Sequence, residues 1–158
     1  MLGYYNNPEA PAEAIKDGWY HTGDLGKMDE KGYIYITGRK KNVIITKNGK
    51  NVYPEELEYY LSNIPYVEES MVWGKDSEDG NDTVIIAAIK PREDEVAEKL
   101  GPDPSDGDIE KLLWEEIDKI NSEQPLFKCI RKMVLRKEPF EKNTSNKIIR
   151  YVDSNKEE

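Results

Sequence analysis

The spacing of hydrophobic and polar residues predicts short strands at the start of the chain. Residues 33–37 are rich in β-branched and aromatic side chains, and residues 29–32 before them have the composition of a turn. Residues 42–46 are predicted to form another strand. The Asn-Gly pair at 48–49 favours a two-residue hairpin turn into a further strand at 51–53. We therefore expect two β-hairpins before the first helix.

Helical and strand-like periodicities alternate after these hairpins. Residues 54–63 place apolar side chains at helical spacing and begin with Pro54, which suits a first helical position. Residues 68–74 and 82–90 are predicted to be paired strands joined by an acidic turn. The next segment, 91–108, is rich in acidic residues, Pro and Gly. It is expected to be a loop inside a domain, with at most a short surface helix.

The remaining pattern predicts one more long helix, one strand and a short terminal helix. Asp108 is expected to cap a helix that has an apolar stripe from Ile109 to Ile120. Residues 129–137 alternate as a half-buried strand does. Residues 144–152 are predicted to form a short helix.

We expect Thr144 to cap that last helix, and the tail after Val152 to be frayed. From residue 42 onward the predicted order is β, α, β, β, α, β. This order indicates an α+β fold with a sheet of about three strands and packed helices.

Composition indicates a folded chain of about one domain. The chain has 158 residues, of which 37% are hydrophobic and 35% charged. Its single cysteine, Cys129, excludes an internal disulfide and makes a reducing, cytoplasmic location the default. With one histidine, His21, no histidine-based metal site is expected. The sequence shows no signal peptide and no apolar run long enough for a membrane span.

Charge is segregated along the chain. Residues 31–50 hold six basic residues and no acidic ones, whereas residues 51–124 hold twenty-one acidic and six basic residues. The acidic middle disfavours general nucleic-acid binding, which depends on neutralising phosphates. The basic stretch itself permits two interpretations, an exposed strand edge protected by lysines or a local anion site.

Two residues are candidates for ligand contact. Asp24 lies between glycines in "TGDLG", where its carboxylate could accept hydrogen bonds from a sugar diol or could simply form a turn. Lys147 lies in a small polar segment near the chain end and could clamp a phosphate or be an ordinary surface lysine. The residues alone leave both alternatives open.

Three motifs, in order, resemble the C-terminal portion of the AMP-forming acyl-CoA synthetases, members of the adenylate-forming superfamily. "GYYNNPEAPAEAIKDGWYHTGDLG" resembles the end of the large domain, and "GRKKNVIITKNGKNVYPEELE" resembles the hinge and the start of the small domain. "EPFEKNTSNKIIRYV" resembles the terminal lysine motif. The sequence of the hinge motif is most similar to that of the long-chain fatty acid CoA ligases.

The resemblance implies a role for each matching residue. Asp24 and Arg39 would hold the ribose hydroxyls of ATP or of the acyl-adenylate. Lys41 would be the hinge about which the small domain turns. Gly49 would lie beside the pantetheine tunnel after that rotation, and Lys147 would reach the substrate carboxylate and the α-phosphate. No residue is assigned to a metal.

The resemblance also implies that the chain is part of a larger enzyme. Residues 1–38 would be the terminal β segment of a missing large domain, and residues 39–158 the mobile C-terminal domain. The family often has glycine before the lysine, where this chain has Asn146, a residue that tolerates left-handed backbone better than most.

The implied substrates and cofactors are a fatty acid, ATP, coenzyme A and Mg²⁺, bound mainly by the large domain in cis. The chain alone is expected to be inactive, and peripheral membrane association of the full-length enzyme stays open. The rival interpretation is a ferredoxin-like nucleic-acid-binding module, or a partner-binding module, without catalysis.

Overall fold

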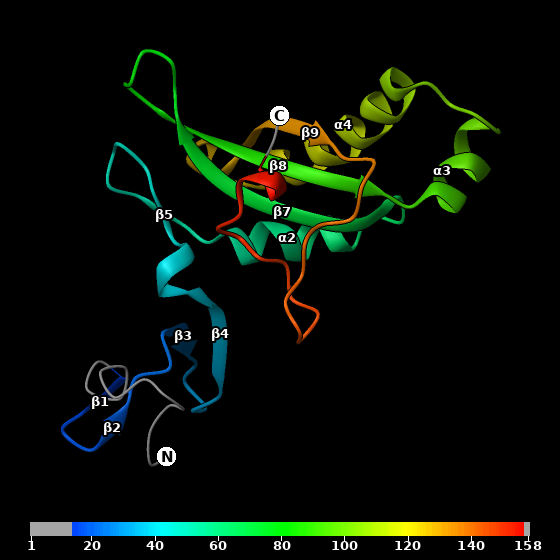
Figure 1. Cartoon of the computed structure of the whole chain (residues 1–158). Helices are drawn as coiled ribbons and strands as arrows, with labels where there is room; N and C mark the ends of the chain where they lie inside the picture. The colour runs from blue at the N-terminus through cyan, green and yellow to red at the C-terminus, as the bar shows by residue number, and fades with distance from the viewer. Residues whose placement is uncertain (1–13, 157–158) are drawn as a thin grey trace. The chain divides into compact units, whose positions relative to one another are not determined.

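The structure, a computed structural model, describes residues 14–156. The chain forms two compact units, Met1–Lys41 and Asn42–Glu158, and each is described by itself (Figure 1). The residues before Ala14, which include part of the predicted large-domain segment, lie outside the described residues.

The described part of the first unit consists of two hairpins. β1 (Ile15–Lys16) pairs with β2 (Trp19–Tyr20), and β3 (Asp24–Met28) pairs antiparallel with β4 (Ile34–Arg39). Asp29 closes the β3–β4 turn, because its side chain accepts hydrogen bonds from the backbone N–H groups of Lys31 and Tyr33, both at 2.9 Å. The turn predicted at 29–32 is therefore confirmed.

The second unit is built on a three-stranded mixed sheet with the order β7-β8-β9. β7 (Val67–Asp76) and β8 (Thr83–Pro91) are antiparallel, whereas β8 and β9 (Ile130–Leu135) are parallel. The helices are α2 (Pro54–Ser62), α3 (Glu93–Leu100) and α4 (Asp106–Ser122). Short 3₁₀ turns occupy Leu126–Lys128 and Asp153–Asn155. The α+β prediction, with about three strands and packed helices, is confirmed.

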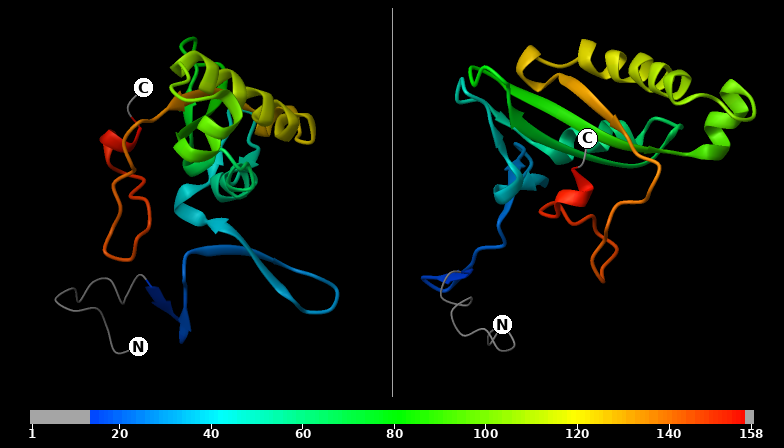
Figure 2. Two further views of the ribbon diagram at one scale, coloured as in Figure 1. Left: turned by 90° about the vertical axis from the view of Figure 1, so that its right-hand side faces the viewer. Right: turned by 45° about the horizontal axis from the view of Figure 1, so that its top comes forward.

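The two faces of this sheet are covered differently. One face carries Ile85, Ala87 and Ile89 of β8 and packs against apolar side chains of α2 and α4. The other face carries Ala88 and packs against Phe140, which lies in the segment after β9. The left view of Figure 2 shows the helices on one side of the sheet and the C-terminal segment on the other.

The helices lie mostly where the sequence predicts them, and the residues at their N-termini explain where each one begins. α2 begins at Pro54 as predicted. α4 begins two residues before the predicted cap: Ser105 is its N-cap, and Asp108 is the third helical residue of a reciprocal capping box. The prediction of Asp108 as the cap was wrong because Ser105 offers the same kind of acceptor one turn earlier. The acidic segment 91–108 contains α3, which buries Val96.

The hairpin of β5 (Ile44–Ile45) and β6 (Asn51–Val52) is confirmed, but its turn differs from the prediction. Thr46 N–H donates to Lys50 O at 2.9 Å, and Gly49 N–H donates to Thr46 O at 2.8 Å. Gly49 has φ +71°, whereas Asn48 is not among the residues with positive φ. The loop therefore has three residues and the type I plus bulge form, since a two-residue type I′ turn needs positive φ at both central positions.

The end of the chain overturns two predictions. Residues 144–152 are not helical: Lys142 and Ile148 form an antiparallel bridge, and Asn146 has φ +59°. The Asn143 side chain accepts hydrogen bonds from two later N–H groups, which competes with helix formation. Residues 153–156 of the tail are not frayed, because Asp153–Asn155 form a 3₁₀ turn and Asn155 is fully buried.

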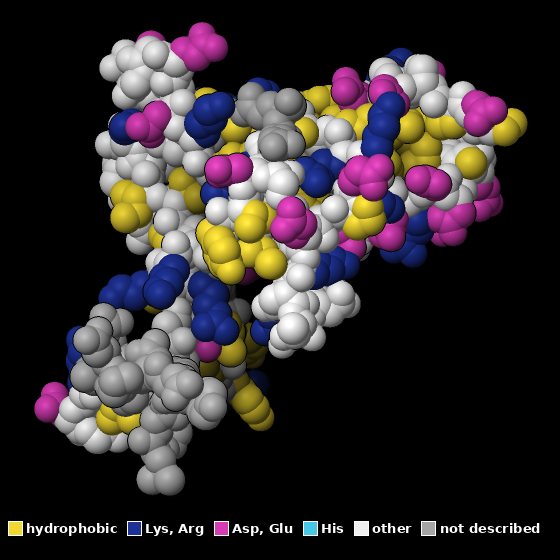
Figure 3. Space-filling view, viewed as in Figure 1, with side chains coloured by type: hydrophobic (Ala, Val, Ile, Leu, Met, Phe, Trp, Pro, Cys, Tyr) yellow, Lys and Arg dark blue, Asp and Glu magenta, His cyan; other side chains and the backbone are white. Residues whose placement is uncertain are grey.

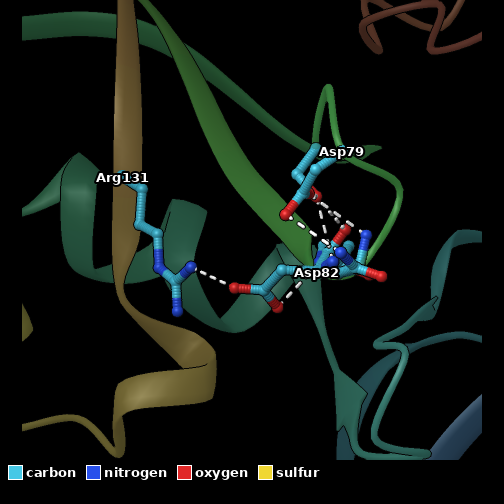
Figure 4. Close-up of polar contacts among 6 residues, drawn as sticks. Asp79, Asp82 and Arg131 are labelled. Carbon is cyan, nitrogen blue, oxygen red and sulfur yellow. Dashed lines mark hydrogen bonds and ion pairs between the residues drawn. The ribbon is translucent and has the colours of Figure 1, made fainter.

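The β7–β8 turn is fastened to β9 by an ion pair between Asp82 and Arg131 (Figure 4). Asp79 organises the same turn by accepting from the Ser77 hydroxyl at 2.6 Å. The hydrogen bonds from Arg131 and from the Thr83 N–H hold the pKa of Asp82 below its ordinary value of 3.8.

Asp82→Asn tests this contact through the pH dependence of unfolding. Because the folded-state pKa lies below the unfolded one, ionised Asp82 stabilises the fold above about pH 4, and this contribution is lost as pH falls through the folded-state pKa. We expect Asp82→Asn to be less stable near neutrality and to lose stability less steeply in acid. Asp118→Asn, on the exposed face of α4, controls for the loss of one negative charge. Identical acid limbs in chemical-denaturation curves of Asp82→Asn and the parent chain would contradict the assignment.

Candidate functional site

Asp24 and Arg39 are brought together by the pairing of β3 and β4. The two residues are register partners, and Arg39 Nε lies 2.8 Å from Asp24 Oδ1. Arg39 also donates to Thr22 O at 3.2 Å. The Asp24 side chain is 29% exposed and the Arg39 side chain 53%, so both can still be reached by a ligand. A carboxylate and a guanidinium held side by side can bind a diol from both the acceptor and the donor side.

Lys41 lies at the end of the first unit, in the 3₁₀ turn Lys40–Asn42 that directly follows β4. Its side chain is exposed. The preceding residue is tied to the hairpin, because Lys40 N–H donates to Gly23 O at 2.9 Å. The role of Lys41 as a hinge stays a prediction.

Gly49 is at the tip of the glycine loop, which we define as residues 46–50. At the base of this loop Thr46 is only 5% exposed, and its hydroxyl accepts from Lys50 N–H at 3.0 Å. A Cβ added to Gly49 would meet no atom within 4 Å. The positive φ accounts for glycine locally, and the described residues leave room for a Cβ there.

Lys147 belongs to the lysine loop, which we define as residues 141–149. This loop is a small hairpin, because Ile149 N–H donates to Glu141 O and Asn143 N–H donates to Lys147 O, both at 2.9 Å. Within residues 14–156 the Lys147 ammonium makes no hydrogen bond or ion pair, and the residue is exposed. The lysine loop therefore presents a free cation.

Asn146 keeps the backbone form that a glycine would have. Its φ of +59° lies in the left-handed region, which Asn enters at lower cost than most residues. The departure from the family pattern next to Lys147 therefore leaves the turn geometry intact.

Two ion pairs tie the lysine loop and the residue after it to β7 and to α2, and sequence reasoning missed both. Lys142 pairs with Glu69 of β7, whose carboxylate also accepts from Phe140 N–H at 3.1 Å. On the other side of the loop, Arg150 pairs with Glu58 of α2. The partners are separated by more than 70 residues in sequence, so no local signal could identify them.

The electrostatics of the two pairs differ because their burial differs. Burial raises the pKa of Glu58, against the lowering effect of the Arg150 guanidinium. Burial also acts to raise the pKa of Glu69, but the hydrogen bonds from Lys142 and Phe140 outweigh it, and the pKa lies below the ordinary value. Burial thus disfavours the ionised form of Glu58, whereas hydrogen bonds favour the ionised form of Glu69. Each carboxylate is paired with a cation from the C-terminal segment.

The glycine loop and the lysine loop do not meet. Both belong to the second unit, and Figures 1 and 2 draw them as separate projections. Figure 3 shows the tip of the lysine loop largely in white, because Asn143, Thr144 and Ser145 carry uncharged polar side chains. The two loops therefore project from the second unit in different places (Figures 1 and 2).

Within residues 14–156 no cluster of acidic, histidine or cysteine side chains is placed to hold a metal ion. Likewise, no helix in that range is long and apolar enough to span a membrane.

The mixed sheet and its two projecting loops define a small domain of the adenylate-forming type. Residues 41–152 match the family described as AMP-binding enzyme C-terminal domain. Because this match covers more than half of the chain, the chain belongs to that family.

Similar proteins are acyl-CoA ligases. A long-chain-fatty-acid–CoA ligase of Mycobacterium tuberculosis is 50% identical over 72 residues, which is 46% of this chain and 12% of that protein. The indoleacetate–CoA ligase of Aromatoleum aromaticum is 41% identical over 93 residues, 59% of this chain and 18% of that protein. The chain therefore spans less than a fifth of the length of these relatives.

A solved structure has a similar fold. The o-succinylbenzoate CoA synthetase of Bacillus subtilis, in complex with its acyl-adenylate intermediate, is 27% identical with a TM-score of 0.72. The similarity covers 95% of this chain and 27% of that structure.

Proposed function

We propose that this chain is the C-terminal part of a long-chain fatty acid CoA ligase. The full protein would form acyl-AMP and pyrophosphate from a fatty acid and ATP, and coenzyme A would then displace AMP to give the thioester. A large domain in cis would supply the phosphate loop, the Mg²⁺ site and the acyl pocket, so the chain alone would be inactive. The observation that carries this proposal is the free Lys147 ammonium on an anchored loop.

The first half-reaction needs a mobile cation. A fatty acid carboxylate must approach a triphosphate of the same sign, and a positioned ammonium offsets the repulsion where charge develops. Lys147 suits this task because no carboxylate within residues 14–156 neutralises it. Asp24 and Arg39 would hold the ribose hydroxyls of the same nucleotide.

The second half-reaction needs space for a thiol rather than a cation. The glycine loop offers a tip without a side chain, in a position where a Cβ would meet no described atom within 4 Å. Because this loop and the lysine loop project separately, a rotation of the second unit about Lys41 would present them to one cleft in turn. We assign Lys41 to this hinge.

Nucleic-acid binding has less support. The sheet has three strands, and its aromatic residue Trp73 packs against the Met71–Ala88–Phe140 cluster instead of forming an open stacking surface. Acidic side chains gather over α3 in Figure 3, which opposes phosphate binding there.

Lys147→Ala in the full-length protein tests the first half-reaction. We expect acyl-adenylate formation, measured by pyrophosphate release, to fall by about 10²–10³. Thioester formation from supplied acyl-AMP should be spared. Lys111→Ala, which removes an exposed positive charge from α4, should leave both half-reactions unchanged. Equal losses in both half-reactions for Lys147→Ala would refute the assigned role.

Gly49→Leu and Gly49→Ala together test the second half-reaction. Both variants place a Cβ at φ +71° and share the backbone strain, so the difference between them isolates the bulk of the leucine side chain. We expect Gly49→Leu to slow thioester formation from acyl-AMP more than Gly49→Ala does, with adenylation similar in the two. A loss confined to adenylation would show that the glycine loop does not serve the thiol step.

The fatty acid substrate is tested by competition between acids. Relatives named for indoleacetate and for o-succinylbenzoate show that the family takes several acids, whereas the relative named above with the highest identity is a long-chain-fatty-acid–CoA ligase. We expect the full-length protein to release pyrophosphate faster with a long-chain fatty acid than with indoleacetate or o-succinylbenzoate. A preference for either aromatic acid would overturn the substrate while leaving the two-step reaction standing.

A further inference from the structure

Asn155 closes the base of the lysine loop from within the structure. Its side-chain oxygen accepts from Glu141 N–H at 2.8 Å. Its side-chain nitrogen donates to Glu141 O at 3.1 Å and to Ile149 O at 2.8 Å. Glu141 and Ile149 are the first and last residues of the lysine loop, so one buried amide joins both of its ends.

The surroundings of Asn155 make this contact specific. The residue is fully buried, and a buried amide that lost these partners would carry the cost of unsatisfied polar groups. The short turn that carries it is fixed separately: Arg136 donates to Ser154 O at 2.8 Å, and the Ser154 hydroxyl donates to Glu141 Oε1 at 2.6 Å. Arg136, which lies outside the lysine loop, therefore helps to hold the turn of Asn155 in place, and Ser154 adds a second tie from this turn to Glu141.

The loop needs such a closure because its tip has little packing of its own. Residues 141–147 are all exposed, and the Lys147 ammonium lies beyond the last anchoring contacts. A cation that must meet a carboxylate and a phosphate loses effect when its position varies, and a misplacement of about 1 Å can cost about 10²-fold in rate. The base of the loop sets the direction in which the tip points.

We infer that Asn155 is a positioning residue for Lys147: it fixes the two ends of the lysine loop so that the ammonium is delivered in one orientation during adenylation. This inference rests on the proposed role of Lys147. It predicts a selective effect on the first half-reaction. The side-chain hydrogen bonds of Asn155 go to Glu141 and Ile149 and not to the glycine loop, which projects elsewhere in the unit.

Two substitutions separate the contacts. Asn155→Asp keeps an acceptor for Glu141 N–H and loses both donors, whereas Asn155→Ala loses all three hydrogen bonds. The alanine variant serves if the aspartate variant does not fold, because it places no carboxylate beside two carbonyl oxygens. Asn121→Ala is the matched control: Asn121 likewise bonds backbone on both sides, accepting from Ile130 N–H at 2.8 Å and donating to Ile130 O at 2.9 Å.

The first measurement uses the 158-residue chain and hydrogen exchange. Ile149 N–H and Asn143 N–H form the ladder of the lysine loop, so their exchange should accelerate about tenfold or more in the Asn155 variants. In Asn121→Ala these two amides should change no more than the core amides do. Unchanged exchange in both Asn155 variants would overturn the closure, whatever the function of Lys147.

The second measurement uses the full-length protein and both half-reactions. We expect the Asn155 variants to lower the adenylation rate constant about tenfold to 10²-fold and to spare thioester formation from acyl-AMP. In a Lys147→Ala background the further loss should vanish, because both residues act through one ammonium. Equal losses in the two half-reactions, or an additive loss in that background, would overturn the inference. If Lys147→Ala itself leaves adenylation unchanged, the proposed function fails instead, and the exchange result still decides the closure.

Discussion

The burial of β8 from both faces is the constraint on which the second unit depends. A central strand with apolar residues on both sides needs two covers, and the α2 and α4 helices supply only one. The other is supplied by the segment after β9, through Phe140, which is 3% exposed. The lysine loop lies where it does because the chain must cross this second face to bury it.

Anchoring at the base and freedom at the tip are two parts of one electrostatic arrangement. Lys142, near the start of the lysine loop, and Arg150, directly after it, are neutralised by carboxylates of the sheet and of α2. Lys147 at the tip has no such partner within residues 14–156. Because the neighbouring cations are already paired, an incoming anion meets one defined charge rather than a diffuse basic surface.

The basic residues of the stretch 38–58 have different partners and do not form one phosphate site. Arg39 is held against Asp24, and Lys47 pairs with Asp76 at 2.7 Å as an ordinary surface contact. The surface interpretation therefore applies to Lys47, whereas an anion site that includes Arg39 stays a prediction. The proposed functions of Lys41 and Gly49 depend on a rotation relative to the proposed large domain.

The sequence by itself determined the strand and helix order, the family and the residues that carry its motifs, because these depend on local periodicity and short spacing. It predicted a helix at 144–152, which was wrong, and a frayed tail after Val152, which was wrong for residues 153–156. The expected helix is replaced by a turn that the Asn143 side chain organises locally, whereas Glu69 and Asn155 act through contacts that only the folded chain brings within reach. Tertiary structure alone decided that the end of the chain folds back across the sheet and holds the lysine loop closed at its base.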